Sequence, residues 1–148
     1  MIRNLKRFGA NEEELLDVYI KQVRSLLELN CPVWNAGMSQ IDCRKIERVK
    51  RTAVAIIRGG NNVKYKDSLQ HLNIETLEER REKLCIKFAK KAFKNPKFTK
   101  WFARDKLTMN TRSIKYPLKG IKTRTKQYRK SPLPYLTNLL NQYLKHKH

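Results

Sequence analysis

The acidic side chains that could support catalysis are scattered along the sequence. Two-metal nucleotidyl transfer needs carboxylates held together at one site, and the four aspartates form no sequence pair of this kind. They are Asp17, Asp42, Asp67 and Asp105. The first two fall within predicted helices, where helix caps and dipoles already explain an acid. The aspartates therefore give no support for a polymerase or nuclease reaction.

Histidine, cysteine and glycine add no catalytic motif. His71, His146 and His148 are too few and too far apart for a metal site or a catalytic triad. The three cysteines are separated by 12 and 42 residues, which matches no paired zinc-ligand spacing, and we expect reduced thiols in the core. They are Cys31, Cys43 and Cys85. No phosphate loop of the form G-x-x-x-x-G-K occurs. We predict that the chain alone is not an enzyme and takes no metal or cofactor.

Phosphate binding is the chemistry that the sequence does offer. Lys and Arg number 34 against 13 acids, a formal net charge of +21, and the pI is about 10.2. The surplus is uneven, since residues 1–80 carry 14 bases and 11 acids (14 − 11 = +3) and residues 81–148 carry 20 bases and two acids (20 − 2 = +18). A basic surplus of this size attracts polyanions and is typical of nucleic-acid binders. RNA or DNA is the expected partner.

A basic stripe on a predicted helix is the leading candidate interface. Its residues recur at helical spacing opposite an apolar face, so they could follow a phosphate backbone without reading sequence. Lysines after Pro96 continue the path, and more bases lie near the C-terminal end. The candidate set is Arg80, Lys83, Lys87, Lys90, Lys91, Lys94, Lys97, Lys100, Arg124, Lys126, Tyr128, Arg129 and Lys130. Tyr128 is included because an aromatic ring can stack on an unpaired base, whereas core packing is the favoured role of Phe98 and Trp101. The alternative is a solvated face that only keeps the protein soluble.

The first predicted helix begins at a capping box and ends before a proline. Asn11 and Glu14 are spaced to satisfy each other's backbone amides, and an apolar stripe follows at helical spacing. Pro32 lacks an amide hydrogen and biases the preceding residue away from helical angles. The sequence therefore predicts a helix over about 11–30, with Trp34 in a fixed turn after it.

Two further long helices are predicted downstream. Ser39 is a helix cap for the second, and Gly59-Gly60 ends it, because glycine tolerates positive φ. A short helix is possible over 64–72. A second capping box at Thr76 opens the third long helix, which is apolar on one side and basic on the other.

The C-terminal part is predicted to be less regular. We expect a short helical turn after Pro96, then a basic extended segment over 103–132 that is mobile without a partner. Residues 133–148 regain a helical stripe, made by Leu136, Leu139, Leu140, Tyr143 and Leu144. The predicted fold is all-α, a small bundle of four to six helices with a basic extended tail and a short C-terminal helix. The predicted domain limits are 1–102, 103–132 and 133–148.

The sequence gives no sign of a membrane or secreted protein. No run of about 18 apolar residues occurs, and charges lie where a signal peptide needs its apolar centre. We expect an intracellular protein of the nucleus or cytoplasm, with no transmembrane segment and no membrane partner. Attachment through the basic helix is disfavoured because only small and moderate apolar residues oppose its lysines.

Four segments, in order along the chain, carry a family resemblance: LKRFGANEEELLDVYIKQVRSLLELNCPVWNAGMS, IERVKRTAVAIIRG, YKDSLQHLNIETLEERREKLCIKFAKKAFKNPKFTKWF and RTKQYRKSPLPYLTNLLN. The first resembles the thumb that follows the palm in the reverse transcriptases of non-LTR (LINE, jockey-like) retrotransposons. The others resemble, in turn, the helix after the C-P-V-W turn, the segment after that helix, and the C-terminal end. Together they cover nearly the whole chain.

The resemblance implies a non-catalytic role in binding nucleic acid. In such polymerases the thumb and the region C-terminal to it hold the template-primer duplex behind the active site, and the C-P-V-W corner, with Pro32 and Trp34, is a structural anchor between helices. The palm with its paired aspartates and the endonuclease are not in this sequence. We therefore expect a non-catalytic nucleic-acid-binding fragment. The alternatives are the partial reading frame of a complete reverse transcriptase, and a helical interaction module that docks a partner helix on residues 133–148.

Overall fold

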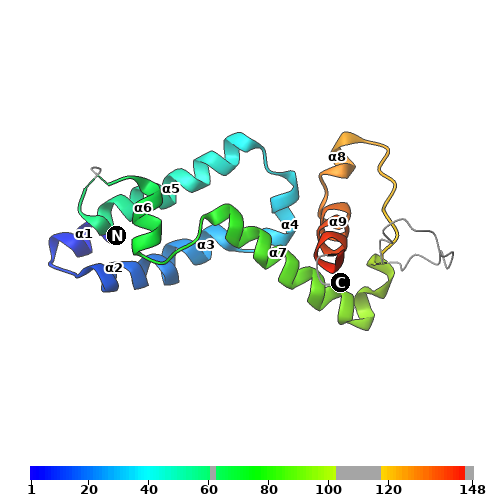
Figure 1. Cartoon of the computed structure of the whole chain (residues 1–148), viewed down its shortest axis with the longest axis horizontal. Helices are drawn as coiled ribbons and strands as arrows, with labels where there is room; N and C mark the ends of the chain where they lie inside the picture. The colour runs from blue at the N-terminus through cyan, green and yellow to red at the C-terminus, as the bar shows by residue number, and fades with distance from the viewer. Residues whose placement is uncertain (61–62, 103–117, 146–148) are drawn as a thin grey trace. The chain divides into compact units, whose positions relative to one another are not determined.

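The computed structural model describes residues 1–60, 63–102 and 118–145 (Figure 1). Within these ranges the chain forms helices and no strand, so the predicted all-α fold is confirmed. The predictions for residues 103–117, Asp105 among them, and for His146 and His148 lie outside the described residues.

The chain forms two compact units, each assembled from two separate segments. The first unit comprises Met1–Leu29 and Met38–Arg81, and the second comprises Asn30–Gly37 and Glu82–His148. These limits differ from the predicted boundary at residue 102. The difference arises because Cys31, from the early segment, is buried in one core with Cys85 and Leu136.

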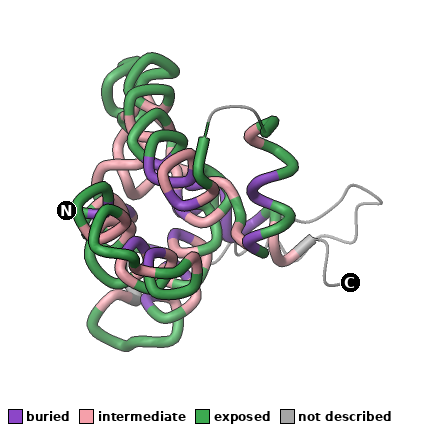
Figure 2. Tube along the Cα trace, turned by 90° about the vertical axis from the view of Figure 1, so that its left-hand side faces the viewer, coloured by how far each residue is buried: buried purple, intermediate pink, exposed green. Residues whose placement is uncertain are grey.

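The first unit is a group of short and long helices. These are α1 (Ile2–Arg7), α2 (Glu12–Val18), the π-helix η1 (Tyr19–Arg24), α3 (Ser25–Glu28), α5 (Gln40–Arg58) and α6 (Tyr65–His71). They enclose a core of Ile2, Leu15, Tyr19, Ala53, Val54, Ile57, Leu69 and Leu72. In Figure 2 the buried residues recur at intervals along the helices, as amphipathic helices require.

The predicted start and end of the first long helix are confirmed. The Asn11 side chain accepts the Glu14 amide at 2.8 Å, and the Glu14 carboxylate accepts the Asn11 amide at 2.9 Å. The helical run ends at Glu28, because Leu29 leaves helical geometry with ψ 125°, and the next residue, Asn30, is left-handed with φ 51°. The middle of the run differs from the prediction, because Tyr19–Arg24 form the π-helix η1, a rare element with i→i+5 hydrogen bonds.

The caps of α5 are also those that the sequence predicts. The Ser39 hydroxyl accepts the Asp42 amide at 3.2 Å, and Gly59 ends the helix at φ 88°. The unpredicted helix α1 lies against this C-terminal end, where the Lys6 ammonium donates to the carbonyls of Ile56 and Ile57. A cation at a helix C-terminus is favoured by the helix dipole and satisfies carbonyls that have no intrahelical partner.

The second unit is built around two amphipathic helices. Its elements are α4 (Cys31–Trp34), the 3-10 turn η2 (Asn35–Gly37), residues 82–94 of α7 (Leu77–Lys94), the 3-10 helix η3 (Pro96–Trp101), α8 (Lys126–Arg129) and α9 (Pro132–Lys145). They share a core of Cys31, Cys85, Ala89, Ala92, Phe102, Leu118, Leu136, Leu139 and Leu140.

The start of α7 lies in the first unit. The Thr76 capping box that was predicted to open α7 forms there, with hydrogen bonds of 3.0 and 3.2 Å to Glu79.

Two local predictions are corrected. Cys31 was expected outside helical angles, but it begins the helical turn α4. Pro32 is tolerated in this turn because it lies near the helix start, where no amide donor is needed. The segment up to residue 132 was expected to be extended, but it contains α8, which Thr125 caps by accepting the Tyr128 amide at 3.1 Å. Helix α9 begins at Pro132, slightly earlier than predicted.

Candidate nucleic-acid interface

The basic face of α7 lies on the solvent side of the second unit. Lys83, Lys87, Lys91 and Lys94 are exposed, whereas Cys85 and other residues on the opposite face are buried. Successive residues of an α-helix turn by about 100°, so positions 83, 87, 91 and 94 fall within one sector of about 80°. The structure thus gathers four of the predicted residues into a single row of ammonium groups.

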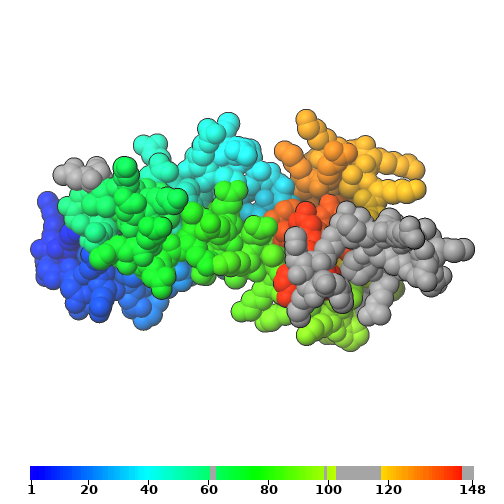
Figure 3. Space-filling model, viewed as in Figure 1, coloured from blue at the N-terminus to red at the C-terminus, as the bar shows by residue number. Residues whose placement is uncertain are grey.

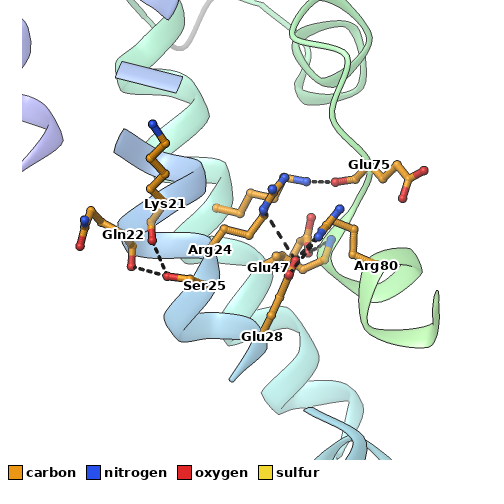
Figure 4. Close-up of polar contacts among 10 residues, drawn as sticks. Lys21, Gln22, Arg24, Ser25, Glu28, Glu47, Glu75 and Arg80 are labelled. Atoms are coloured by element: carbon orange, nitrogen blue, oxygen red, sulfur yellow. Dashed lines mark hydrogen bonds and ion pairs between the residues drawn. The ribbon is translucent and has the colours of Figure 1, made fainter. Parts of the chain in front are cut away.

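Arg80, the first residue of the predicted stripe, is engaged elsewhere. Its guanidinium meets the Glu28 carboxylate in a bidentate pair, with Nε to Oε1 at 2.6 Å and a terminal nitrogen to Oε2 at 3.1 Å (Figure 4). These hydrogen bonds raise the pKa of Arg80. Arg80 belongs to the first unit, and a phosphate would have to compete with Glu28 for it. We therefore leave it out of the interface.

Lys90 is half-buried and lies against an aromatic ring. Its ammonium nitrogen is 3.3 Å from the centroid of the Tyr143 ring on α9. A cation over the face of an aromatic ring is attracted by the ring quadrupole, by about 0.5–2 kcal/mol depending on desolvation. Lys90 therefore ties α7 to α9 and adds less to the exposed row than its neighbours.

The row of lysines continues into η3. The Asn95 side chain caps this helix by accepting the Lys97 amide at 3.0 Å. Lys97 and Lys100 are exposed, and with three residues per turn they lie on the same edge of the 3-10 helix. Both predicted residues keep the solvent position that phosphate binding requires.

A second group of exposed bases lies on the segment that leads to α9. Its predicted members Arg124, Lys126, Tyr128, Arg129 and Lys130 are all exposed, and side chains of this segment project from the surface in Figure 3. Lys119 and Lys122 are exposed in the same segment and were missed. The signal that could have found them is the basic composition of residues 119–130 alone.

One side chain fixes the start of this basic segment. The buried Asn141 side chain accepts the Leu118 amide and donates to the Leu118 carbonyl, each at 3.1 Å, and the Leu118 side chain is fully buried. Asn141 thus pairs with the Leu118 backbone as a neighbouring strand would. The basic segment therefore leaves the core at a defined point.

The described part of the second unit has very few acids. Glu82 is the one acid in it, against Lys83, Lys87, Lys90, Lys91, Lys94, Lys97, Lys100, Lys119, Lys122, Arg124, Lys126, Arg129 and Lys130. One carboxylate cannot pair with this number of cations. Like charges at neighbouring helical positions repel, by a few tenths of a kcal/mol per pair, so the surplus of positive charge on this unit is mildly unfavourable for the unit by itself.

The predicted structural anchor packs within the second unit. Trp34 is partly buried against the core, Pro32 is half-buried beside it, and Cys31 in the same turn is fully buried. The side-chain amide of Asn35, in the following turn, donates to the Tyr135 hydroxyl of α9 at 3.1 Å. Burial raises the pKa of Tyr135, which keeps this hydroxyl protonated. The corner connects distant parts of the chain, and Cys31 is its most buried member.

A partly buried polar cluster in the first unit was missed by sequence reasoning. Lys50 is 1% exposed and donates to the Glu75 carbonyl, and Glu47 accepts the Leu77 amide at 3.1 Å and the Tyr65 hydroxyl. Burial lowers the pKa of Lys50 and raises that of Tyr65. Figure 4 shows Glu47 close to the ion pair of Glu28. No local signal marks such residues, since their partners lie far away in the sequence.

Comparisons of the chain with models of protein families, with curated proteins and with solved structures found no match. No helix within residues 1–60, 63–102 and 118–145 is both long and apolar enough to cross a membrane. Over the same ranges, the histidine, cysteine and carboxylate side chains form no group of three that could hold a metal ion.

Proposed function

We propose that the protein binds the phosphate backbone of RNA or DNA through the basic surface of its second unit, without marked sequence preference. The surface comprises Lys83, Lys87, Lys91, Lys94, Lys97, Lys100, Lys119, Lys122, Arg124, Lys126, Arg129 and Lys130. The observation that carries the proposal is the excess of exposed cations over Glu82, the single acid among the described residues of that unit. Contacts of this kind release counterions and give affinity without sequence information.

We also propose that this binding is the non-catalytic grip of a thumb-like fragment of a non-LTR reverse transcriptase. The support is the ordered set of resembling segments, of which the third contains α7 and η3 and the fourth contains α8 and α9 up to residue 141. The same grip would serve a longer polymerase of which this chain is a piece. In either case the expected ligand is a duplex or an RNA–DNA hybrid.

A partner helix docked on the apolar stripe of residues 133–148 has less support. Leu136, Leu139 and Leu140 are buried in the core of the second unit, and Tyr143 carries the Lys90 contact. The stripe therefore already packs within the chain, and a partner would have to displace that packing.

The dependence of binding on salt tests the proposal. If about six to eight phosphates are neutralised, a plot of log affinity against log salt concentration should have a slope of roughly −4 to −7. The triple variant Lys87→Gln, Lys91→Gln, Lys94→Gln should bring the slope closer to zero by about 2.7, since each duplex phosphate contact contributes about 0.9. Glutamine is nearly as good a helix former as lysine, so α7 should stay intact by circular dichroism.

A matched control removes the same charge from the first unit. Arg44, Arg48 and Lys66 are exposed there, and their triple exchange to glutamine should leave the slope within about 0.5 of the parent value. A parent slope near zero, or equal changes in the two triple variants, would refute a phosphate surface on the second unit.

A further inference from the structure

Trp101 is an exposed aromatic residue held in place by aromatic neighbours. It ends η3 and is 43% exposed, whereas the next residue, Phe102, is 3% exposed. The Phe98 ring lies 4.6 Å from the indole, centroid to centroid, with the ring planes at 53°. Phe102 in turn meets Phe93 edge to face at 6.2 Å. Two neighbours of Trp101 in the sequence, Phe98 and Phe102, are therefore packed against other rings, while 43% of Trp101 itself is exposed.

The surroundings of Trp101 do not suit an apolar partner. Lys97 and Lys100 are exposed on the same 3-10 helix, and Lys94 is exposed at the end of α7 just before it. A protein that buried the indole would have to desolvate these ammonium groups or supply acids for them, and desolvating an unpaired charge is costly. Nucleic acid satisfies both needs, since its bases stack on aromatic rings and its phosphates pair with lysine.

Trp34 shows how the chain uses a tryptophan for packing. It is partly buried against the core cluster that contains Cys31 and Leu136, and it is not among the large apolar residues that remain exposed, as Trp101 is. Phe98 and Trp101 also differ from each other, because Phe98 is half-buried against that cluster. The expected core role thus fits Phe98 better than Trp101.

We infer that Trp101 is a stacking platform for an unpaired base, so that the preferred ligand has a single-stranded segment next to the backbone bound by the lysines of α7 and η3. This inference rests on the proposed function, which supplies the phosphate contacts that bring a strand to Trp101. It adds a preference for a duplex with a single-stranded overhang over a blunt duplex. The preference tolerates any base, because every base offers a ring face.

The test compares overhangs with and without bases. A duplex of fixed sequence is prepared with a short oligothymidine overhang, with an overhang of equal length made of abasic residues, and with blunt ends. The two overhangs carry the same phosphates, so only stacking distinguishes them. The parent protein should bind the thymidine overhang about 5- to 150-fold more tightly than the abasic one, as one stacked base would give.

Substitutions at residue 101 assign the difference to the indole. Trp101→Ala and Trp101→Leu should lose the preference for the thymidine overhang, because alanine and leucine have no ring on which a base can stack. Trp101→Phe keeps a ring and should therefore keep part of the preference. Phe8→Ala is the matched control, since Phe8 is 89% exposed in the first unit, and it should change nothing. The chain has two tryptophans, so in the Trp34→Phe variant all tryptophan fluorescence comes from Trp101. This fluorescence should fall when the thymidine overhang binds and should not change when the abasic overhang binds.

The failure of this inference differs from that of the proposed function. Equal affinities of the parent for the two overhangs, or a preference that survives in Trp101→Ala, would overturn the stacking role while salt-dependent binding of the blunt duplex persisted. Salt-independent or absent binding of all three ligands would overturn the phosphate surface and the stacking role together.

Discussion

Replacement of Asn141 by alanine should destabilise the second unit by about 2–6 kcal/mol. If Leu118 stays in place, its buried amide and carbonyl both lose their partner, at about 1–3 kcal/mol each. If the segment detaches, two hydrogen bonds worth about 0.5–1.5 kcal/mol each are lost. Detachment also exposes the fully buried Leu118 side chain, which costs a further 1.5–3 kcal/mol or so. The two routes give overlapping ranges, so the size of the loss does not depend on which one the protein takes.

The measurement is urea unfolding followed by tryptophan fluorescence. Trp34 and Trp101 both belong to the second unit, so the fluorescence signal reports that unit, whereas far-UV circular dichroism reports both. Asn138→Ala is the control, because Asn138 is exposed on the same helix and an exposed substitution should stay within about 0.5 kcal/mol. If Asn141→Ala matched Asn138→Ala in the fluorescence transition, the pairing of Asn141 with the Leu118 backbone would carry no stability and the reasoning would be wrong.

Two further predictions concern the polar cluster of the first unit, which contains neither tryptophan and is followed by circular dichroism. Glu28→Gln should lower the free energy of unfolding by about 1–3 kcal/mol, less than the loss of a fully buried pair, because the Arg80 side chain is 30% exposed. The control Asp17→Asn breaks an exposed ion pair and should lower it by at most about 0.5 kcal/mol. Equal losses of stability in the two variants would contradict the prediction. Burial raises the pKa of Tyr65 above its ordinary value of 10.0, so the folded state keeps a proton that the unfolded chain loses. The Tyr65 contribution is complete below pH 10 and shrinks as the pH rises beyond it, and Tyr65→Phe should therefore weaken the fall in stability between pH 10 and 11.5 by up to about 1.4 kcal/mol per pH unit. Urea midpoints at several pH values measure it, and parallel curves for parent and variant would refute it.

The boundaries of the helices could be predicted because their signals are local. Asn11 with Glu14, Ser39, and Thr76 with Glu79 each place a side-chain partner within three residues of the amide that it satisfies. Gly59 ends its helix at positive φ by its own chemistry. Such signals survive in one sequence without any knowledge of the tertiary fold.

Features that depend on distant partners could not be predicted. Lys50 and Arg81 are 1% exposed, although lysine and arginine are normally surface residues, and the Arg80 partner Glu28 lies 52 positions away. The helix α1 has few apolar residues and is tied to α5 through Lys6. In the candidate interface, the exposed lysines of α7 could be predicted from helical spacing. Arg80 could be excluded only once the structure showed its ion pair with Glu28.

Residues 30–37 belong to the second unit although they lie between two segments of the first, and this has a consequence for folding during synthesis. Asn35 and its hydrogen-bond partner Tyr135 are 100 positions apart, so the second core cannot close until residue 135 and the rest of α9 have been synthesised. The first unit, complete by residue 81, can fold on the ribosome, since chains fold from the N-terminus during synthesis. The core that buries Cys31 includes Leu136, Leu139 and Leu140 of α9, so this thiol reaches its buried position only after α9 has been synthesised.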